Sequence, residues 1–158
     1  MQKPSNNNPY YFNFNALVHY QIKIDDAALE DLEFKKTPSH SDVLLSNILF
    51  KNHPPQNIKD IAFIESLNQL GFQKKEIAHK HFDTINELFK EQDSQNIEEP
   101  YCGAVYRDVL IFYKENKIIG IAKLCFSCGH FSIVGTKKDT SNFSTTGTLK
   151  KLQQLLHN

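Results

Sequence analysis

The stretch RDVLIFYKENKIIGIAKLCF, residues 107–126, decides the fold of this chain. Its two halves, 107–114 and 117–126, are rich in valine, isoleucine, phenylalanine and tyrosine, which favour β-strands. Glu115 and Asn116 separate the halves, and a two-residue connection is typical of a tight β-hairpin. The stretch therefore predicts an antiparallel hairpin whose apolar face needs a cover of helices.

The length of the turn also predicts the register of the hairpin. With two residues in the turn, Lys114 faces Lys117, and Asp108 faces Lys123 in a favourable charge pair. The same register, continued beyond the hairpin, brings the three cysteines of the chain to one end of it: Cys102, Cys125 and Cys128.

The segment Cys125-Phe126-Ser127-Cys128-Gly129-His130 has the spacing of a metal-binding knuckle. With Cys102 it offers three thiolates, and His130 is the nearest candidate for a fourth zinc ligand. A second complete C-x-x-C is missing from the sequence, so two other interpretations stay open. The thiols are inert core residues, or they form a redox pair, although a redox C-x-x-C usually begins a helix rather than ending a strand.

The run YRDVLIFYKENKIIGIAKLCFSCG, with a cysteine upstream, resembles a pattern found in small uncharacterised bacterial proteins. The resemblance covers residues 101 to about 135. It implies no known fold, activity, cofactor or site residue.

The rest of the chain predicts an α+β fold, with a helical hairpin packed on a small antiparallel sheet and a C-terminal helix. Residues 14–25 alternate loosely and predict a strand whose Val18 and Tyr20 face the core and whose His19 faces outward. A further strand, which follows the two strands of the hairpin, is expected at 131–135. Apolar spacing and capping residues predict helices at about 25–33, 42–50, 58–70, 77–89 and 148–156.

Residues 1–9 are polar with two prolines and predict a flexible tail, so one domain is expected over 10–158. Eighteen basic and eighteen acidic side chains give a net charge of zero, which disfavours nucleic acid as a partner. The apolar runs are too short for a membrane helix, and the N-terminus lacks a secretory signal, which together predict a cytoplasmic protein.

The common sequence signatures of hydrolases, metalloproteases and nucleotide-binding proteins do not occur in the chain. We therefore interpret it as a non-enzymatic domain that binds another protein and carries a structural cysteine cluster, with zinc as the candidate cofactor. The alternative is a thiol-dependent redox or metal-handling protein. The sequence fixes neither the partner nor the oligomeric state.

Overall fold

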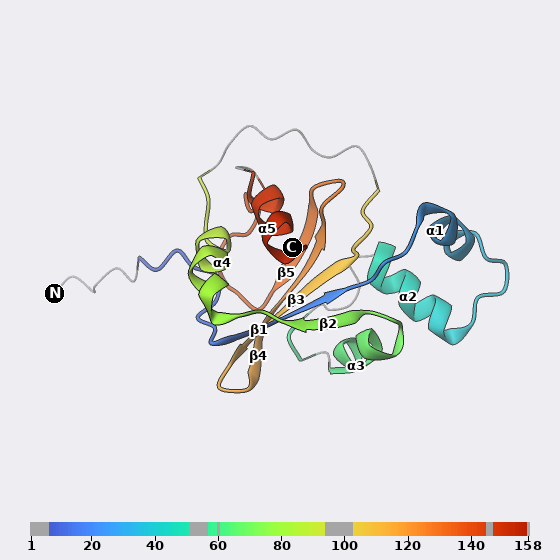
Figure 1. Cartoon of the computed structure of the whole chain (residues 1–158), viewed down its shortest axis with the longest axis horizontal. Helices are drawn as coiled ribbons and strands as arrows, with labels where there is room; N and C mark the ends of the chain where they lie inside the picture. Colours follow the sequence, from blue (N-terminus) through green and yellow to red (C-terminus); the bar gives the residue numbers. More distant parts are fainter. Residues whose placement is uncertain (1–6, 51–56, 60, 94–102, 145–146, 158) are drawn as a thin grey trace.

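The chain folds around a five-stranded antiparallel sheet with the strand order β2-β1-β3-β4-β5. The computed structural model describes residues 7–50, 57–59, 61–93, 103–144 and 147–157. The strands are β1 Ala16–Gln21, β2 Gln73–Glu76, β3 Asp108–Lys114, β4 Lys117–Cys125 and β5 His130–Val134. The predicted hairpin is β3–β4, and β3 is the central strand of the sheet (Figure 1).

The turn of the hairpin has the predicted form. Lys114 faces Lys117, and the two residues between them have positive φ angles, 49° for Glu115 and 63° for Asn116. Two successive left-handed residues are typical of a type I′ turn, which matches the twist of the strands it joins.

A β-bulge changes the register farther along the hairpin. The pairing shifts by one residue between Phe112 and Tyr113, so Asp108 faces Leu124. The predicted pairing of Asp108 with Lys123 is therefore wrong. Because successive side chains of a strand point to opposite faces, Asp108 and Lys123 lie on opposite sides of the sheet.

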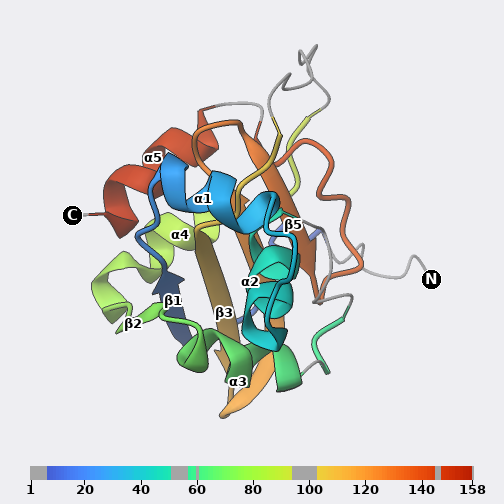
Figure 2. The same ribbon diagram turned by 90° about the vertical axis from the view of Figure 1, so that its right-hand side faces the viewer.

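Helices cover both faces of this sheet, which gives three layers (Figures 1 and 2). One face carries Leu17, Leu110 and Phe112 and packs against α4 (Phe82–Leu88) and α5 (Thr148–Leu156); we call it the α4–α5 face. The other carries Val18, Val109 and Ile111 and packs against α1 (Asp26–Glu33), α2 (His40–Phe50) and α3 (Ile61–Gln69); we call it the α1–α3 face. The α+β class and the C-terminal helix are thus confirmed.

The predicted helical hairpin differs from the observed connection. Its two helices are present as α3 and α4, but strand β2 and the 3-10 helix η1 (His79–His81) lie between them. Gly71 has a φ angle of 94° and turns the chain back towards β1 after α3. Ile77 then donates a backbone hydrogen bond to Leu17, so its apolar side chain is buried at a strand end rather than in a helix.

Helix α2 starts two residues earlier than predicted, whereas α5 starts at the predicted residue. Ser39 caps α2: its hydroxyl accepts a hydrogen bond from the backbone N–H of Asp42, whose carboxylate accepts one from the N–H of Ser39. Helix α5 begins after Gly147, which has a φ angle of 72°, and Thr148 is buried in its first turn.

An aromatic segment before β1 completes the α4–α5 face. Tyr11 donates a backbone hydrogen bond to Phe89, and both side chains are buried. The ring of Phe12 packs directly on Gly120, where an added Cβ would lie only 2.3 Å from the ring. The proposed tail of residues 1–9 stays a prediction, since residues 1–6 lie outside the described ranges. No helix in the described part of the chain is long and apolar enough to cross a membrane.

Candidate metal site

Three segments far apart in the sequence bring His19, Asp108 and His157 together. In the ladder between β1 and β3, Gln21 faces Asp108, so His19 and Asp108 lie on the same α4–α5 face of neighbouring strands. Helix α5 crosses this face and ends at His157, its C-terminal capping residue. The strand order and the docking of α5 therefore create the cluster.

One carboxylate oxygen lies at the centre of the cluster. Oδ1 of Asp108 is 2.7 Å from Nε2 of His19 and 2.8 Å from Nε2 of His157. All three ligand atoms lie within 4.8 Å of one another. Nε2 of His157 is also 3.3 Å from the side-chain nitrogen of Gln21, which is the weaker contact because it is longer.

The cluster is buried on one side and open on the other. The side chains of His19 and Asp108 are 3% and 4% exposed, whereas that of His157 is 28% exposed. A small cavity of about 130 Å³ adjoins Asp108 and His157. Its other lining residues are mostly polar and include Gln21, Ser127 and Gln153.

Aromatic packing fixes the two imidazole rings. The rings of His19 and His157 stack with an interplanar angle of 22° at 6.0 Å. The ring of Phe126 meets His157 edge to face at 5.3 Å. The orientation of His157 therefore does not depend on the hydrogen bond to Asp108 alone.

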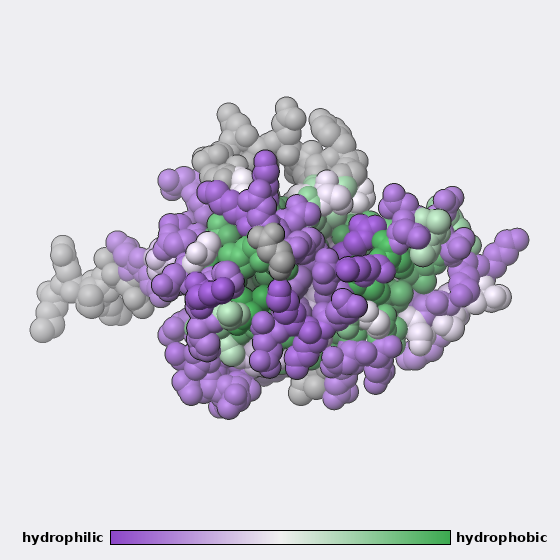
Figure 3. All heavy atoms as spheres, in the orientation of Figure 1, coloured by the Kyte–Doolittle hydropathy of each residue, from purple (hydrophilic) through white to green (hydrophobic). Residues whose placement is uncertain are grey.

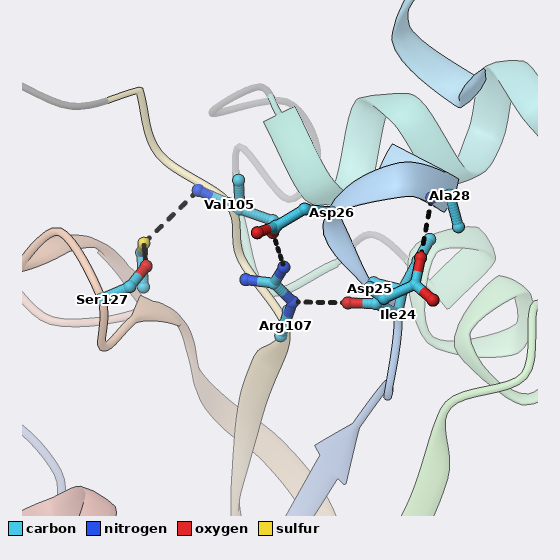
Figure 4. Close-up of polar contacts among 8 residues, drawn as sticks. Ile24, Asp25, Asp26, Ala28, Val105, Arg107 and Ser127 are labelled. Carbon is cyan, nitrogen blue, oxygen red and sulfur yellow. Dashed lines mark hydrogen bonds and ion pairs between the residues drawn. The ribbon is translucent and has the colours of Figure 1, made fainter. Parts of the chain in front are cut away.

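Arg107 anchors the start of β3 next to the cluster. Its Nε donates to the carbonyl of Ile24 at 3.2 Å, and its guanidinium lies 3.5 Å from the carboxylate of Asp26 (Figure 4). Both contacts join β3 to the start of α1, and Arg107 also lines the small cavity beside Asp108 and His157. They fix the backbone that presents Asp108.

The donor set suits a divalent transition metal. Two imidazole nitrogens and one carboxylate oxygen are common zinc ligands, and catalytic zinc sites use three protein ligands and keep one position open. Zinc bonds of about 2.0–2.2 Å would place two tetrahedral ligands about 3.3 Å apart. The observed 2.7 and 2.8 Å are hydrogen-bond distances, so a metal would require each pair to separate by about 0.5 Å.

The same contacts also have a purely structural interpretation. Two histidines that donate to Oδ1 of one buried carboxylate give that oxygen its hydrogen-bond partners and tie the end of α5 to the sheet. Metal binding and this clamp predict different results in solution, because only a metal site gives a saturable metal titration.

The cysteine region begins at the end of β4 beside the cluster, because Asp108 faces Leu124 in the ladder and Ser127 lines the same small cavity. Cys125 is the last residue of β4, is buried and carries a free thiol. Its sulfur accepts a bond from the backbone N–H of Val105 at 3.4 Å and lies 3.4 Å from the hydroxyl of Ser127 (Figure 4). His130 is half-buried at the start of β5 and faces Cys125 in the ladder.

Cys128 is disulfide-bonded in this structure, so its sulfur is not a thiolate here. The chain turns back after Cys125, where the N–H of Gly129 bonds to the Cys125 carbonyl, and the ladder therefore does not continue to Cys128 as we expected. Cys102 lies outside the described residues. A zinc site formed by Cys102, Cys125, Cys128 and His130 thus stays a prediction, and it requires reduction of Cys128.

The sequence pattern did not predict the His–Asp–His cluster, because the alternation of residues 14–25 placed His19 on an outward face. That inference assumed a sheet with one solvent-exposed face, whereas both faces of β1 are covered and His19 is 2% exposed. The available signal was Leu17, an apolar residue on the face assigned to solvent, because a strand with apolar residues on both faces is typical of a sheet covered on both sides.

Comparison of the chain with protein-family models, with curated proteins and with solved structures gave no match. The resemblance of residues 101–135 to small bacterial proteins stays a prediction. Any function must therefore be argued from the cluster and the surface.

Proposed function

We propose that this protein binds one divalent transition-metal ion, with His19, Asp108 and His157 as its ligands. The observation that carries the proposal is the convergence of three ligand atoms within 4.8 Å beside a polar cavity. The two buried ligands come from the central strands, so the site is held on rigid elements.

The arrangement fits a site with an open coordination position. Asp108 and His157 both line the small cavity, and this is where a water or a small ligand has access. A metal held by three protein ligands supplies a water of lowered pKa and polarises a bound oxygen. Gln21 and Gln153 line the same cavity and can orient such a ligand through their amides.

Cobalt titration tests the metal site. We expect the reduced protein to bind one Co²⁺ per chain, with the visible spectrum of a nitrogen- and oxygen-ligated ion. Removal of an outer-shell partner alone weakens metal binding about 10–100-fold, so the His157→Gln variant, which lacks a ligand, should lose more than about 100-fold. The His40→Gln variant is the matched control, since His40 is exposed at the start of α2.

The same spectrum separates the two candidate sites. Thiolate ligands give an intense sulfur-to-cobalt charge-transfer band, which the histidine site cannot produce. A spectrum dominated by this band and unchanged by His157→Gln would contradict our proposal and favour the cysteine site. Absence of binding by the wild type would leave the cluster as a structural clamp.

The predicted protein-binding role is a second proposal, supported by the surface of α1 and α2. Phe34 is 72% exposed at the end of α1, and Val43 is 44% exposed on α2. A groove of about 510 Å³ between the two helices has an apolar floor that includes Leu32 and Leu45, and three charged residues also line it: Asp31, Lys35 and Asp42. Figure 3 shows apolar atoms on the side of the molecule where Figure 1 places these helices.

Affinity capture tests this second proposal. We expect the wild type to retain a partner from extracts of its source cells that a Phe34→Glu/Val43→Glu variant does not retain, because a charge in an apolar contact must be desolvated. The control is Lys36→Glu, an exposed residue two positions from Phe34. If all three proteins retain the same set, this surface is not the interface.

A further inference from the structure

We propose that a second pocket, between β2, η1 and α5, binds a small organic anion with an apolar body. The pocket has a volume of about 420 Å³ and contains none of the three metal-site residues. This inference goes beyond the metal site and does not depend on it.

Basic side chains from three elements converge on this pocket. Lys75 comes from β2, His81 from η1 and Lys151 from α5, and they are far apart in the sequence. Glu76 is the only acidic residue among the described residues that line it. Among the described residues that line the pocket, the two lysines outnumber the one glutamate, in a chain whose net charge is zero. Such a concave basic surface concentrates anions.

The position of each lysine follows from the fold. Lys75 faces His19 in the ladder between β1 and β2, which directs its side chain to the α4–α5 face. Lys151 lies one turn before Leu155 on α5, so both residues present the same side of that helix. Lys74 and Lys150, by contrast, are the sequence neighbours of these lysines and do not line the pocket.

The remaining wall of the pocket is apolar. Ile77, Ala78 and Leu155 line it, and Gln154 adds one amide. Pockets of about 300–1,000 Å³ that combine apolar walls with a few polar groups are typical of small-molecule sites. The basic groups fit a phosphate or carboxylate head, and the apolar wall fits an aliphatic or aromatic body.

Binding of simple probe compounds at constant ionic strength tests the proposal. The probes are phenyl phosphate, phenylacetate, inorganic phosphate and neutral benzyl alcohol, with calorimetry and the melting temperature as readouts. We expect saturable binding of at least one aromatic anion, tighter than that of inorganic phosphate, and no binding of benzyl alcohol. Tighter binding of phenyl phosphate would identify a phosphate head group as the preferred one, and tighter binding of phenylacetate would identify a carboxylate.

Matched charge reversals locate the site. Lys151→Glu should weaken binding of the preferred anion at least about tenfold, equivalent to about 1.4 kcal/mol, whereas Lys150→Glu should leave it within a factor of about two. Lys75→Gln and Lys74→Gln form the second pair: Lys75→Gln should weaken binding of the same anion, whereas Lys74→Gln should leave it nearly unchanged. Both lysines of each pair are exposed, so unliganded melting temperatures should stay close to that of the wild type.

Three results would overturn the inference. The first is no saturable binding of either aromatic anion. The second is an equal effect of Lys150→Glu and Lys151→Glu, which would indicate nonspecific attraction to the basic helix face. The third is equal affinity for inorganic phosphate and phenyl phosphate, because the apolar wall would then contribute nothing.

Discussion

Replacement of Asp108 by alanine is expected to destabilise the protein by about 1–3 kcal/mol, the usual cost of leaving a buried hydrogen-bonding group without its partner. The reason is that the side chain of His19 is 3% exposed and its Nε2 would lose the hydrogen bond to Asp108, which water cannot easily replace at a buried position. The end of α5 would also lose its bond from His157 to the sheet. Urea unfolding, with the midpoint and slope compared to the wild type, measures the change.

An exposed carboxylate provides the control for this prediction. Asp26 contacts Arg107, but its side chain is fully exposed, so Asp26→Ala should change stability by less than about 0.5 kcal/mol. A loss of similar size in both variants would mean that the buried cluster contributes no more than a surface ion pair.

Urea unfolding in the presence of zinc tests whether the same cluster binds a metal. A ligand that binds only the folded state stabilises it in proportion to the logarithm of its concentration over Kd, so zinc should raise the unfolding midpoint of the wild type. It should not raise that of Asp108→Ala, which lacks the central ligand. If Asp108→Ala is destabilised but zinc does not raise the unfolding midpoint of the wild type, the cluster is a structural clamp and not a metal site.

The second large effect concerns Lys123, whose side chain is buried on the α1–α3 face. Burial lowers the pKa of its ammonium group to about 7. The amine lies 4.6 Å from the centre of the Tyr106 ring. An ammonium group is costly in this environment, because it loses the hydration that it has in the unfolded chain.

The stability of the wild type should therefore rise with pH between about 7 and 10.5. In this window the unfolded chain holds a proton on Lys123 that the folded chain has released, so each pH unit adds about 1.4 kcal/mol. Below pH 7 both states are protonated and the full penalty applies. Lys123→Met keeps an unbranched side chain of similar size, so it should remove the pH dependence that Lys123 causes. The substitution should be most stabilising at or below pH 7.

Urea unfolding of both proteins from pH 6 to 10 measures the difference directly, because other titrating groups are common to the two curves. Lys117→Met is the control, since Lys117 is exposed on the same strand β4. Parallel curves for the wild type and Lys123→Met would show that Lys123 has the same pKa in the folded and unfolded states.

Local chemistry in the sequence determined most of the secondary structure. The apolar β-branched halves of 107–126 and the short Glu115–Asn116 connection specified the hairpin and its left-handed turn residues. The acidic start of α1 and the apolar stripe of α5 specified two helices, because capping and periodicity act within a few residues. The α+β class followed from these elements.

Only the tertiary structure decided the register, the sheet order and the candidate site. The bulge at Phe112 accompanies the packing of Phe12 on Gly120, a contact between segments about a hundred residues apart that no local pattern encodes. The placement of β1 beside β3 and the docking of α5 brought His19, Asp108 and His157 together. Such long-range contacts depend on which apolar faces pack together, and a single sequence leaves many of those pairings open.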